Sequence, residues 1–570
     1  MSEKFLLHAD GIPSREPSWS IPAIIQSRLR AGDVPSTLEA SQLKAIGETA
    51  QKDLDFLEEK LAQSRTALDD VERERDIVRR YRDAHLGLLA PVRQLPVELL
   101  LKVFRLCCTS LENPGLSIIT DRNAIFASAI STCTLNLAQT CSLWRSVVLH
   151  SPYLWAWICV DLTWRPIDVH ALVSLYLRRS ANWLITLHVE AFEGITHNAI
   201  NLETTSSYCQ ELGFASLGLF EILLGNAYRW VWASFDLSLD VYSELSTLID
   251  HWHGINLQNL RTLELRSETV VNQGLPGSRF NAFFDEFQVA TSLDTIRLPR
   301  LIPSLLFSFR QISLIEVMQC HTMAEIRHTL ALCPELKTLK IGKEYGLDLY
   351  EHEDLEEISS PSLETLTLSI RAISGLKLLP VLNLPKLANF TVVATACLLS
   401  NDESTRAAAE GLAVMLRRSP SLRSLGLEGY PLSETGLLRI LPFMPNLEAI
   451  WISIGGDCGE FITSHLFDRL SLSPTRNIAL VPRLVSFQIR IGPTLLWGYA
   501  LDSGFSLPNF DRVISMLESR SGTLKQFSLC TRRDDSYGGG QWAEGYRREQ
   551  WRLHALKSNG MEIELDTLYT

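Results

Sequence analysis

Residues 161–570 repeat one hydrophobic pattern, Leu-x-x-Leu-x-Leu, in which other aliphatic residues or Phe can replace Leu. Side chains alternate between the two faces of a strand, so the fourth and sixth positions of each copy share one face and the fifth lies on the other. The pattern therefore predicts short strands that are buried on one side. Weaker copies begin at Leu184 and Trp232, and the clear copies begin at Leu260, Leu293, Ile312, Leu336, Leu363, Leu387, Leu422, Leu447, Leu484 and Leu524.

The segments between these strands have helical periodicity. In residues 405–418, Ala, Leu and Met recur at helical spacing before Pro420 stops the helix, and a helix over residues 541–557 precedes a last strand over residues 561–565. A strand with its return helix cannot bury its own apolar face, so neighbouring units must stack. Although its copies are unevenly spaced, this region resembles an irregular leucine-rich-repeat solenoid, with parallel strands and return helices. The predicted class is α/β, or α+β once the helical N-terminal part is included.

The N-terminal part has a different pattern. Residues 1–45 contain four prolines and little periodicity, which predicts a flexible lead. Residues 46–88 predict a charged helix, because the sequence from Lys52 contains no Gly or Pro before Gly87. Residues 52–85 could form a short coiled coil and a weak homodimer, or a single solvated helix, because polar residues interrupt the seam. The seam consists of Leu54, Leu57, Leu61, Ser64, Leu68, Val71, Arg75 and Val78.

Between these two parts lies a compact set of apolar helices. Leu95-Pro96 predicts a helix start, because Pro suits the first helical turn and Glu98 suits the positive end of the helix dipole. A second helix is predicted over residues 135–148, followed by the turn Ser151-Pro152-Tyr153-Leu154-Trp155. The apolar faces of the two helices consist of Leu99, Leu100, Val103, Phe104 and Cys107, and of Leu137, Cys141, Trp144 and Val148.

This set of residues resembles the F-box, in the variant common in fungal proteins. The resemblance implies a three-helix domain over residues 89–160 that docks the Skp-type adaptor of cullin-RING ubiquitin ligases. The chain departs from the family at Ser142 and Leu143, where basic residues are usual, and in the long connection between Thr109 and Cys133. The adaptor-binding positions that the resemblance implies are Leu95, Pro96, Leu99, Leu100, Val103, Phe104, Leu137, Cys141, Trp144 and Trp155.

The resemblance also implies a function: the substrate-recognition subunit of a cullin-type (SCF) E3 ubiquitin ligase. Two alternatives stay open, namely an F-box scaffold or sensor without ligase output, and a plain leucine-rich-repeat interaction module. Cys107, Cys108 and Cys141 lie on apolar helix faces, where loss of water disfavours a reactive thiolate. We therefore expect no enzyme activity in this chain and no catalytic residue.

The strand residues that do not face the core predict a surface for a protein substrate. Mixed charge with an exposed Trp suits such a surface, since Trp and Arg are enriched among interface hot spots. The alternative is a solvated face, with the partner site on loops or on the convex side. The predicted substrate-binding residues are Arg266, Arg297, Lys340, Trp451 and Arg490.

Composition limits the class of partner and the cellular compartment that we expect. The 570 residues carry a net charge of -12, which argues against nucleic acid, whose binding depends on Lys and Arg. Eleven cysteines without a Cys-x-x-Cys pair, and an N-terminus too charged for a secretory signal, favour reduced thiols in the cytoplasm or nucleus. The apolar stretch 212–235 is interrupted by Glu221, Asn226 and Arg229, so we expect no membrane span.

Three further motifs contain residue types that can bind phosphate or metal ions. Residues 455–459 are glycine-rich but lack the Lys-Ser/Thr end of a phosphate loop, which favours a tight turn. His251-Trp252-His253 has no Cys or carboxylate cluster to complete a metal site, and the acidic residues 351–357 fit a solvated segment. We therefore expect no metal site and no cofactor.

Overall fold

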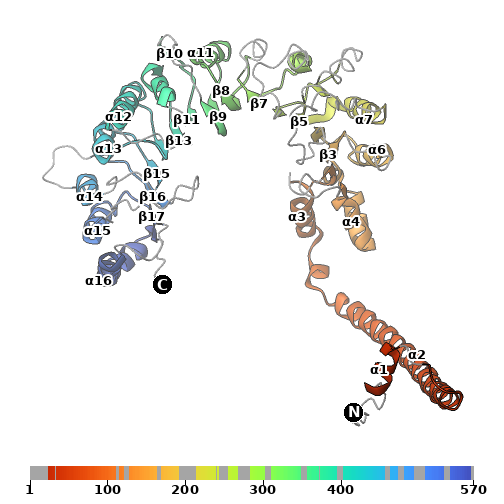
Figure 1. The fold of residues 1–570 in the computed structure, drawn as a ribbon. Helices are drawn as coiled ribbons and strands as arrows, with labels where there is room; N and C mark the ends of the chain where they lie inside the picture. The colour runs from red at the N-terminus through yellow and green to blue at the C-terminus, as the bar shows by residue number, and fades with distance from the viewer. Residues whose placement is uncertain are drawn as a thin grey trace. The chain divides into compact units, whose positions relative to one another are not determined.

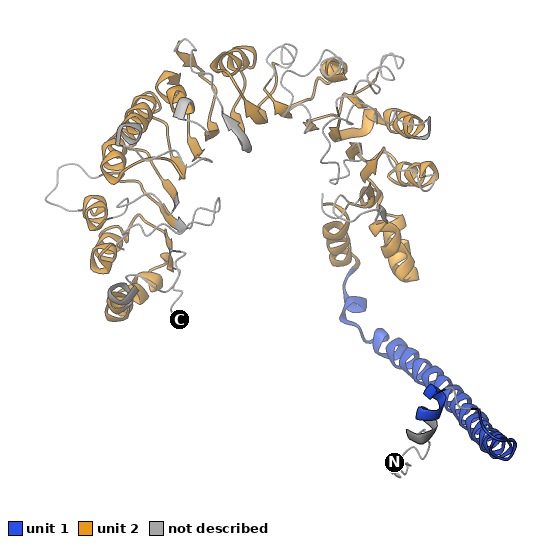
Figure 2. Ribbon diagram, viewed as in Figure 1, with its two compact units in different colours: residues 1–96 blue, residues 97–570 orange. Residues whose placement is uncertain are grey.

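The computed structural model describes most of the chain as two compact units, residues 1–96 and residues 97–570 (Figure 2). The described residues are 23–31, 34–110, 114–120, 128–162, 169–191, 214–238, 241–242, 245, 255–266, 283–301, 310–347, 356–370, 373–394, 402–455, 463–472, 480–492, 508–531 and 539–565.

The first unit is helical and contains α1 (Ala23–Ala31), α2 (Thr37–Leu88) and the 3₁₀ turn η1 (Pro91–Gln94). Helix α2 begins well before residue 46, so the expected flexible lead is wrong for its last residues. A capping box explains the early start: the Ser36 hydroxyl accepts from the backbone N–H of Glu39, whose carboxylate accepts from the backbone N–H of Ser36 at 2.9 Å. Helix α2 has no buried residue.

The second unit begins with helices that join directly onto a sheet. They are α3 (Val97–Cys108), α4 (Cys133–Thr140) and α5 (Ser142–Leu149), followed by the turn η2 (Pro152–Trp155) and strand β3 (Trp157–Asp161). The single helix predicted over residues 135–148 is wrong. Cys141 has an extended backbone (φ -160°, ψ 169°), which ends α4, and its sulfur accepts from the Trp144 N–H to cap α5.

The long connection between the first two of these helices contains two strands, β1 (Leu116–Thr120) and β2 (Ser128–Ser131). Strand β1 pairs antiparallel with β2 and parallel with β3. The main sheet therefore starts inside the helical region, and residues 97–160 belong to the same compact unit as the rest of the sheet.

Within the described residues the main sheet has sixteen strands, and from β3 onward these strands lie in chain order and pair in parallel. Strands β10 (Ile358–Ser359) and β12 (Leu382–Asn383) form a separate small sheet. The other strands are β4 (Ile185–Ala191), β5 (Trp230–Leu237), β6 (Thr262–Arg266), β7 (Thr295–Arg300), β8 (Leu314–Cys320), β9 (Thr338–Leu347), β11 (Thr365–Ile370), β13 (Asn389–Ala394), β14 (Ser424–Glu428), β15 (Ala449–Gly455), β16 (Ser486–Gly492), β17 (Gln526–Thr531) and β18 (Glu562–Leu565).

Helices and 3₁₀ turns connect these strands and lie along one face of the sheet (Figure 1). They are α6 (His170–Arg179), α7 (Phe214–Leu224), η3 (Ala227–Arg229), η4 (Glu286–Val289), α11 (Met323–Leu332), η6 (Ile373–Val381), α12 (Asp402–Arg417), α13 (Glu434–Ile440), η7 (Leu441–Phe443), α14 (Ser464–Leu470), α15 (Phe510–Ser519) and α16 (Gly539–Ser558).

The predicted hydrophobic positions form the core between the sheet and the helices. Leu260, Leu263 and Leu265 are buried, and the corresponding residues of the other clear copies are buried with them in one continuous cluster. The two weaker copies differ at their first position, because Leu184 is 39% exposed and Trp232 is half-buried. This confirms the predicted mixed α/β class: a long N-terminal helix, then parallel strands alternating with helices in a solenoid-like array.

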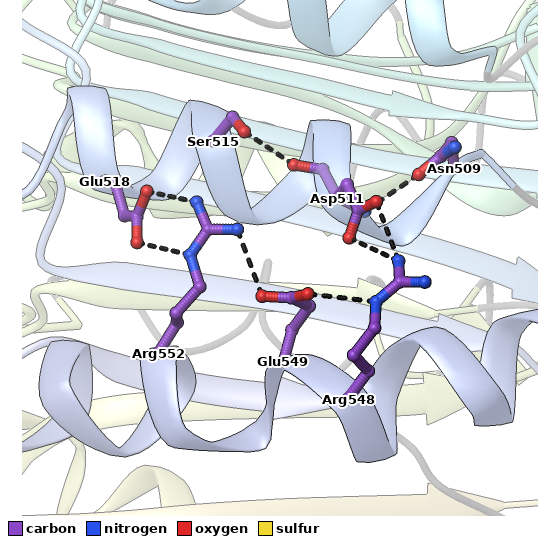
Figure 3. A network of polar contacts seen from close by, with 7 residues as sticks. All are labelled: Asn509, Asp511, Ser515, Glu518, Arg548, Glu549 and Arg552. Atoms are coloured by element: carbon purple, nitrogen blue, oxygen red, sulfur yellow. Dashed lines mark hydrogen bonds and ion pairs between the residues drawn. The ribbon is translucent and has the colours of Figure 1, made fainter.

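Ion pairs join the last two helices, α15 and α16 (Figure 3). Arg548 contacts both carboxylate oxygens of Asp511, at 2.9 and 2.8 Å, and the Nε of Arg552 donates to Glu518 at 2.6 Å. Glu549 accepts from both arginines, at 3.1 and 3.2 Å. The network adds polar contacts between the last two helices where the hydrophobic core ends.

Candidate protein-interaction surfaces

Helix α3 has one packed side and one exposed side, and both are apolar. Leu100, Phe104 and Cys108, spaced by four residues, are buried in the core. Leu99 and Val103 are 45% and 43% exposed. A short helix that keeps aliphatic side chains in water on one side while its other side is packed is typical of a protein-binding surface.

The packed side of α3 rests on the helix pair α4 and α5. The rings of Phe104 and Trp144 meet edge to face with centroids 4.8 Å apart. Trp144 and Leu137 are half-buried against the core. Because the ring of Phe104 fills the space next to Trp144, the exposed side chains of α3 are held on a rigid support.

Trp155 connects the helical region to the first coils of the sheet. Its ring is buried, its Nε1–H donates to the carbonyl of Val148 at 3.0 Å, and it meets the ring of Tyr176 edge to face at 4.9 Å. The hydroxyl of Tyr176 in turn donates to the carbonyl of Gly115 at 2.9 Å. Gly115 is required there, because an added Cβ would lie 2.6 Å from the carbonyl oxygen of Leu154.

The ten predicted adaptor-binding residues therefore differ in accessibility. In their own units Pro96, Leu99 and Val103 are exposed, Leu95, Leu137, Cys141 and Trp144 are half-buried, and Leu100, Phe104 and Trp155 are buried. The three buried residues pack in the core and support the exposed residues. The sequence reasoning missed Leu106 and Leu143, which are exposed, and it placed Cys107 on the apolar face, although the structure exposes that thiol.

Cys108 is the thiol of α3 that the core encloses. Burial raises its pKa, and its sulfur also donates to the sulfur of Cys133 at 3.3 Å. A thiol in this position stays protonated at neutral pH, which agrees with the expectation that it is a packing residue.

The residues between the buried strand positions lie in rows across the sheet, on what we call the polar face. Strand register places Arg297, Lys340 and Trp451 in one row, and Arg266 and Arg490 in a neighbouring row two residues further along their strands. The first row consists of Cys159, His188, Ser234, Glu264, Arg297, Glu316, Lys340, Thr367, Thr391, Gly426, Trp451, Gln488, Ser528 and Glu564.

Two of the predicted substrate-binding arginines are held by carboxylates. The side chain of Glu264 is only 3% exposed, and it binds Arg266 at one oxygen and Arg297 at the other, the latter at 3.4 Å. Arg297 also pairs with Glu316 at 3.1 Å. Because these charges are paired within the sheet, Arg266 and Arg297 would offer a partner oriented guanidinium groups within a nearly neutral cluster.

The other predicted substrate-binding residues lie further along the sheet. Trp451 is half-buried, and a Cβ added to Gly426 would lie 3.3 Å from its ring. The small residue thus leaves room for the indole beside the neighbouring strand. Lys340 is half-buried and Arg490 is exposed.

The first strands of the polar face bring together a group that sequence reasoning missed. The thiol of Cys159, the imidazole of His188 and the carboxylate of Glu190 each place one donor atom within 4.8 Å of the others. Burial, followed by the charges of Glu190 and Asp161, raises the pKa of the Cys159 thiol. Spacing along the sequence offers no signal for this group, because Cys159 and His188 are neighbours only through strand pairing.

Parts of the three further sequence motifs lie outside the described residues, namely His251-Trp252-His253, residues 351–355 and residues 456–459. In the part of the chain that is described, no helix combines the length and the apolar composition that crossing a membrane requires. The chain matches no model of a known protein family, and comparison with curated proteins finds no significant match.

Proposed function

We propose that this chain is the substrate-recognition subunit of a cullin-type (SCF) E3 ubiquitin ligase. Helices α3 to α5 and the turn η2 would dock the Skp-type adaptor, and the polar face of the sheet would hold a protein substrate. The observation that carries the proposal is the exposed aliphatic side of α3, formed by Leu99, Val103 and Leu106, opposite a fully packed side.

In this proposal other subunits transfer ubiquitin, and the chain contributes proximity. Holding a substrate beside the loaded carrier enzyme raises the effective concentration of the acceptor lysine. The chain would need no catalytic residue or cofactor of its own. Such a complex would work in the cytoplasm or the nucleus, where thiols stay reduced.

The first test measures binding of the purified Skp-type adaptor to the full chain. The whole chain is needed because β1 and β3 pair within the main sheet, so a fragment ending near residue 160 would expose an unpaired strand edge. Val103→Asp should abolish adaptor binding, since it places a charge in an apolar interface. The matched control is Val289→Asp, at a valine of η4 that is 57% exposed.

The outcomes separate the candidate functions. The ligase proposal is excluded if the wild type, Val103→Asp and Val289→Asp bind the adaptor equally, or if the folded wild type does not bind it. The remaining candidate would then be a plain leucine-rich-repeat interaction module. If the adaptor binds as expected, cullin inhibition in cells should stabilise the protein bound to the polar face. A bound partner whose lifetime does not change on cullin inhibition would favour a scaffold or sensor.

A further inference from the structure

The first coils of the main sheet place three metal-binding side chains side by side on the polar face. Cys159 on β3 and His188 on β4 are directly opposite each other in the strand register. Glu190 lies two residues beyond His188, so its side chain projects from the same face of β4. One donor atom from each of the three residues lies within 4.8 Å of the other two.

The imidazole of His188 is held in place but is not fully satisfied. Its Nε2 lies 2.7 Å from Oε1 of Glu190, and its ring stacks on that of Trp232 with centroids 6.4 Å apart. Its other nitrogen, Nδ1, is buried and has no hydrogen-bond partner among the described residues. Because Nε2 is the nitrogen that faces Glu190, it is the one available to an ion shared with that carboxylate, and Nδ1 would then carry the ring proton.

The charges around the three residues favour a cation. In the strand register Asp161 lies opposite Glu190, and Asp236 lies on the other side of Glu190. The row continues with Arg266 opposite Asp236, so three carboxylates and one guanidinium leave a net negative charge beside the site. A basic side chain of a partner could also use these carboxylates. However, the thiol of Cys159 and the imidazole nitrogen of His188 add donors that a transition-metal ion uses better than an ammonium or guanidinium group.

We propose that Cys159, His188 and Glu190 form a binding site for one divalent metal ion of the zinc type. A sulfur, a nitrogen and an oxygen donor suit Zn²⁺ and disfavour Mg²⁺ and Ca²⁺, which take oxygen ligands. Three protein ligands leave a fourth, tetrahedral position for water. The site is independent of adaptor binding by α3.

The observed geometry requires only small side-chain movements to reach this state. Zinc bonds of about 2.0–2.3 Å place tetrahedral ligand atoms roughly 3.5 Å apart. The donor atoms of Cys159, His188 and Glu190 therefore approach by about 1.3 Å at most, and the 2.7 Å contact between His188 and Glu190 opens as both turn to the ion. The thiol of Cys159 loses its proton to solvent when the sulfur binds the metal ion, so the affinity for the ion increases as the pH rises.

The test titrates the full chain, stripped of metal with a chelator, with Co²⁺ and then with Zn²⁺. We expect one Co²⁺ per chain, with the absorption of a thiolate-to-cobalt charge transfer, and displacement by Zn²⁺. Cys159→Ser should remove this absorption, and His188→Gln should weaken Co²⁺ binding at least tenfold. The matched control is Cys530→Ser on β17, also on the polar face, which should keep both signals.

Zinc should also raise the thermal unfolding midpoint of the wild type and leave that of His188→Gln unchanged. If Cys159→Ser does not fold, the thermal midpoints of the wild type and His188→Gln with and without zinc test the proposal instead. The proposal is overturned if the folded wild type binds no Co²⁺. It is also overturned if Cys159→Ser binds Co²⁺ through thiolate with wild-type affinity, because an exposed thiol such as Cys107 would then be the ligand.

Discussion

Replacing Arg520 with Met should locally destabilise the C-terminal coils of the sheet. Arg520 is fully buried directly after α15, and its guanidinium donates to three backbone carbonyls. Nε bonds Leu470 at 2.7 Å, and the two terminal nitrogens bond Val481 at 3.0 Å and Leu480 at 2.6 Å. Leu470 is the last residue of α14, so the cation lies at the negative end of a helix. Burial lowers the pKa of Arg520 to about 10, which leaves it charged at neutral pH.

The expected loss of local unfolding free energy follows from these contacts. A hydrogen bond to a charged group contributes about 1.5–3 kcal/mol, and buried acceptors left without a donor add a penalty. The carbonyl of Val481 keeps a second donor, the N–H of Leu484 at 3.2 Å. The methionine also recovers part of the loss by avoiding the cost of burying a charge. We therefore expect Arg520→Met to lower the local unfolding free energy by about 3–5 kcal/mol.

Hydrogen exchange read by mass spectrometry measures this loss coil by coil. In a solenoid each coil contacts mainly its neighbours, so protection should fall over residues 464–472 and 510–531 and stay unchanged over residues 157–191. The matched control is Arg512→Met on α15, whose side chain is 57% exposed and pairs with Asp468 at the surface. It should change protection little. If Arg520→Met kept wild-type protection, the cost of desolvating the guanidinium would cancel the gain from its hydrogen bonds, and the expected destabilisation would be wrong.

Three further predictions concern other parts of the chain. In a denaturant titration, Phe104→Ala should lower the unfolding free energy by about 3–5 kcal/mol, because it leaves a cavity in the core. Val103→Ala leaves no cavity and should lower the unfolding free energy by less than about 1 kcal/mol. Equal losses in the two variants would contradict this. Arg552 lowers the pKa of Glu518 below its usual 4.5, so this ion pair stabilises the fold above that pH and is lost as the pH falls through the lowered pKa. Glu518→Gln should therefore lose less stability on acidification than the wild type, and parallel pH profiles would argue against the pair. Removing residues 1–88 should leave the thermal midpoint of the second unit unchanged, because α2 buries no residue, and a fall of several degrees would exclude that.

The hydrophobic repeat was readable from the sequence because it is a local pattern. Each strand carries its own buried positions, as at Leu263 and Leu265, so the parallel strands and their return helices followed without knowledge of neighbours. The exposed and buried sides of α3 were only partly predictable. Helical spacing groups the apolar residues Leu99, Leu100 and Phe104 along one side of the helix. Which of them faces the core depends on what packs against the helix.

Other features depend on contacts between elements that are distant in the chain. Cys141 breaks a helix that its flanking sequence favours, and the extended backbone there turns α5 so that Trp144 meets the ring of Phe104. Strand register brings Cys159 beside His188. These contacts join residues far apart in the chain, and sequence spacing carries no information about them. Local periodicity therefore determined the repeating architecture, while packing between elements and strand register determined the surfaces on which the proposed functions depend.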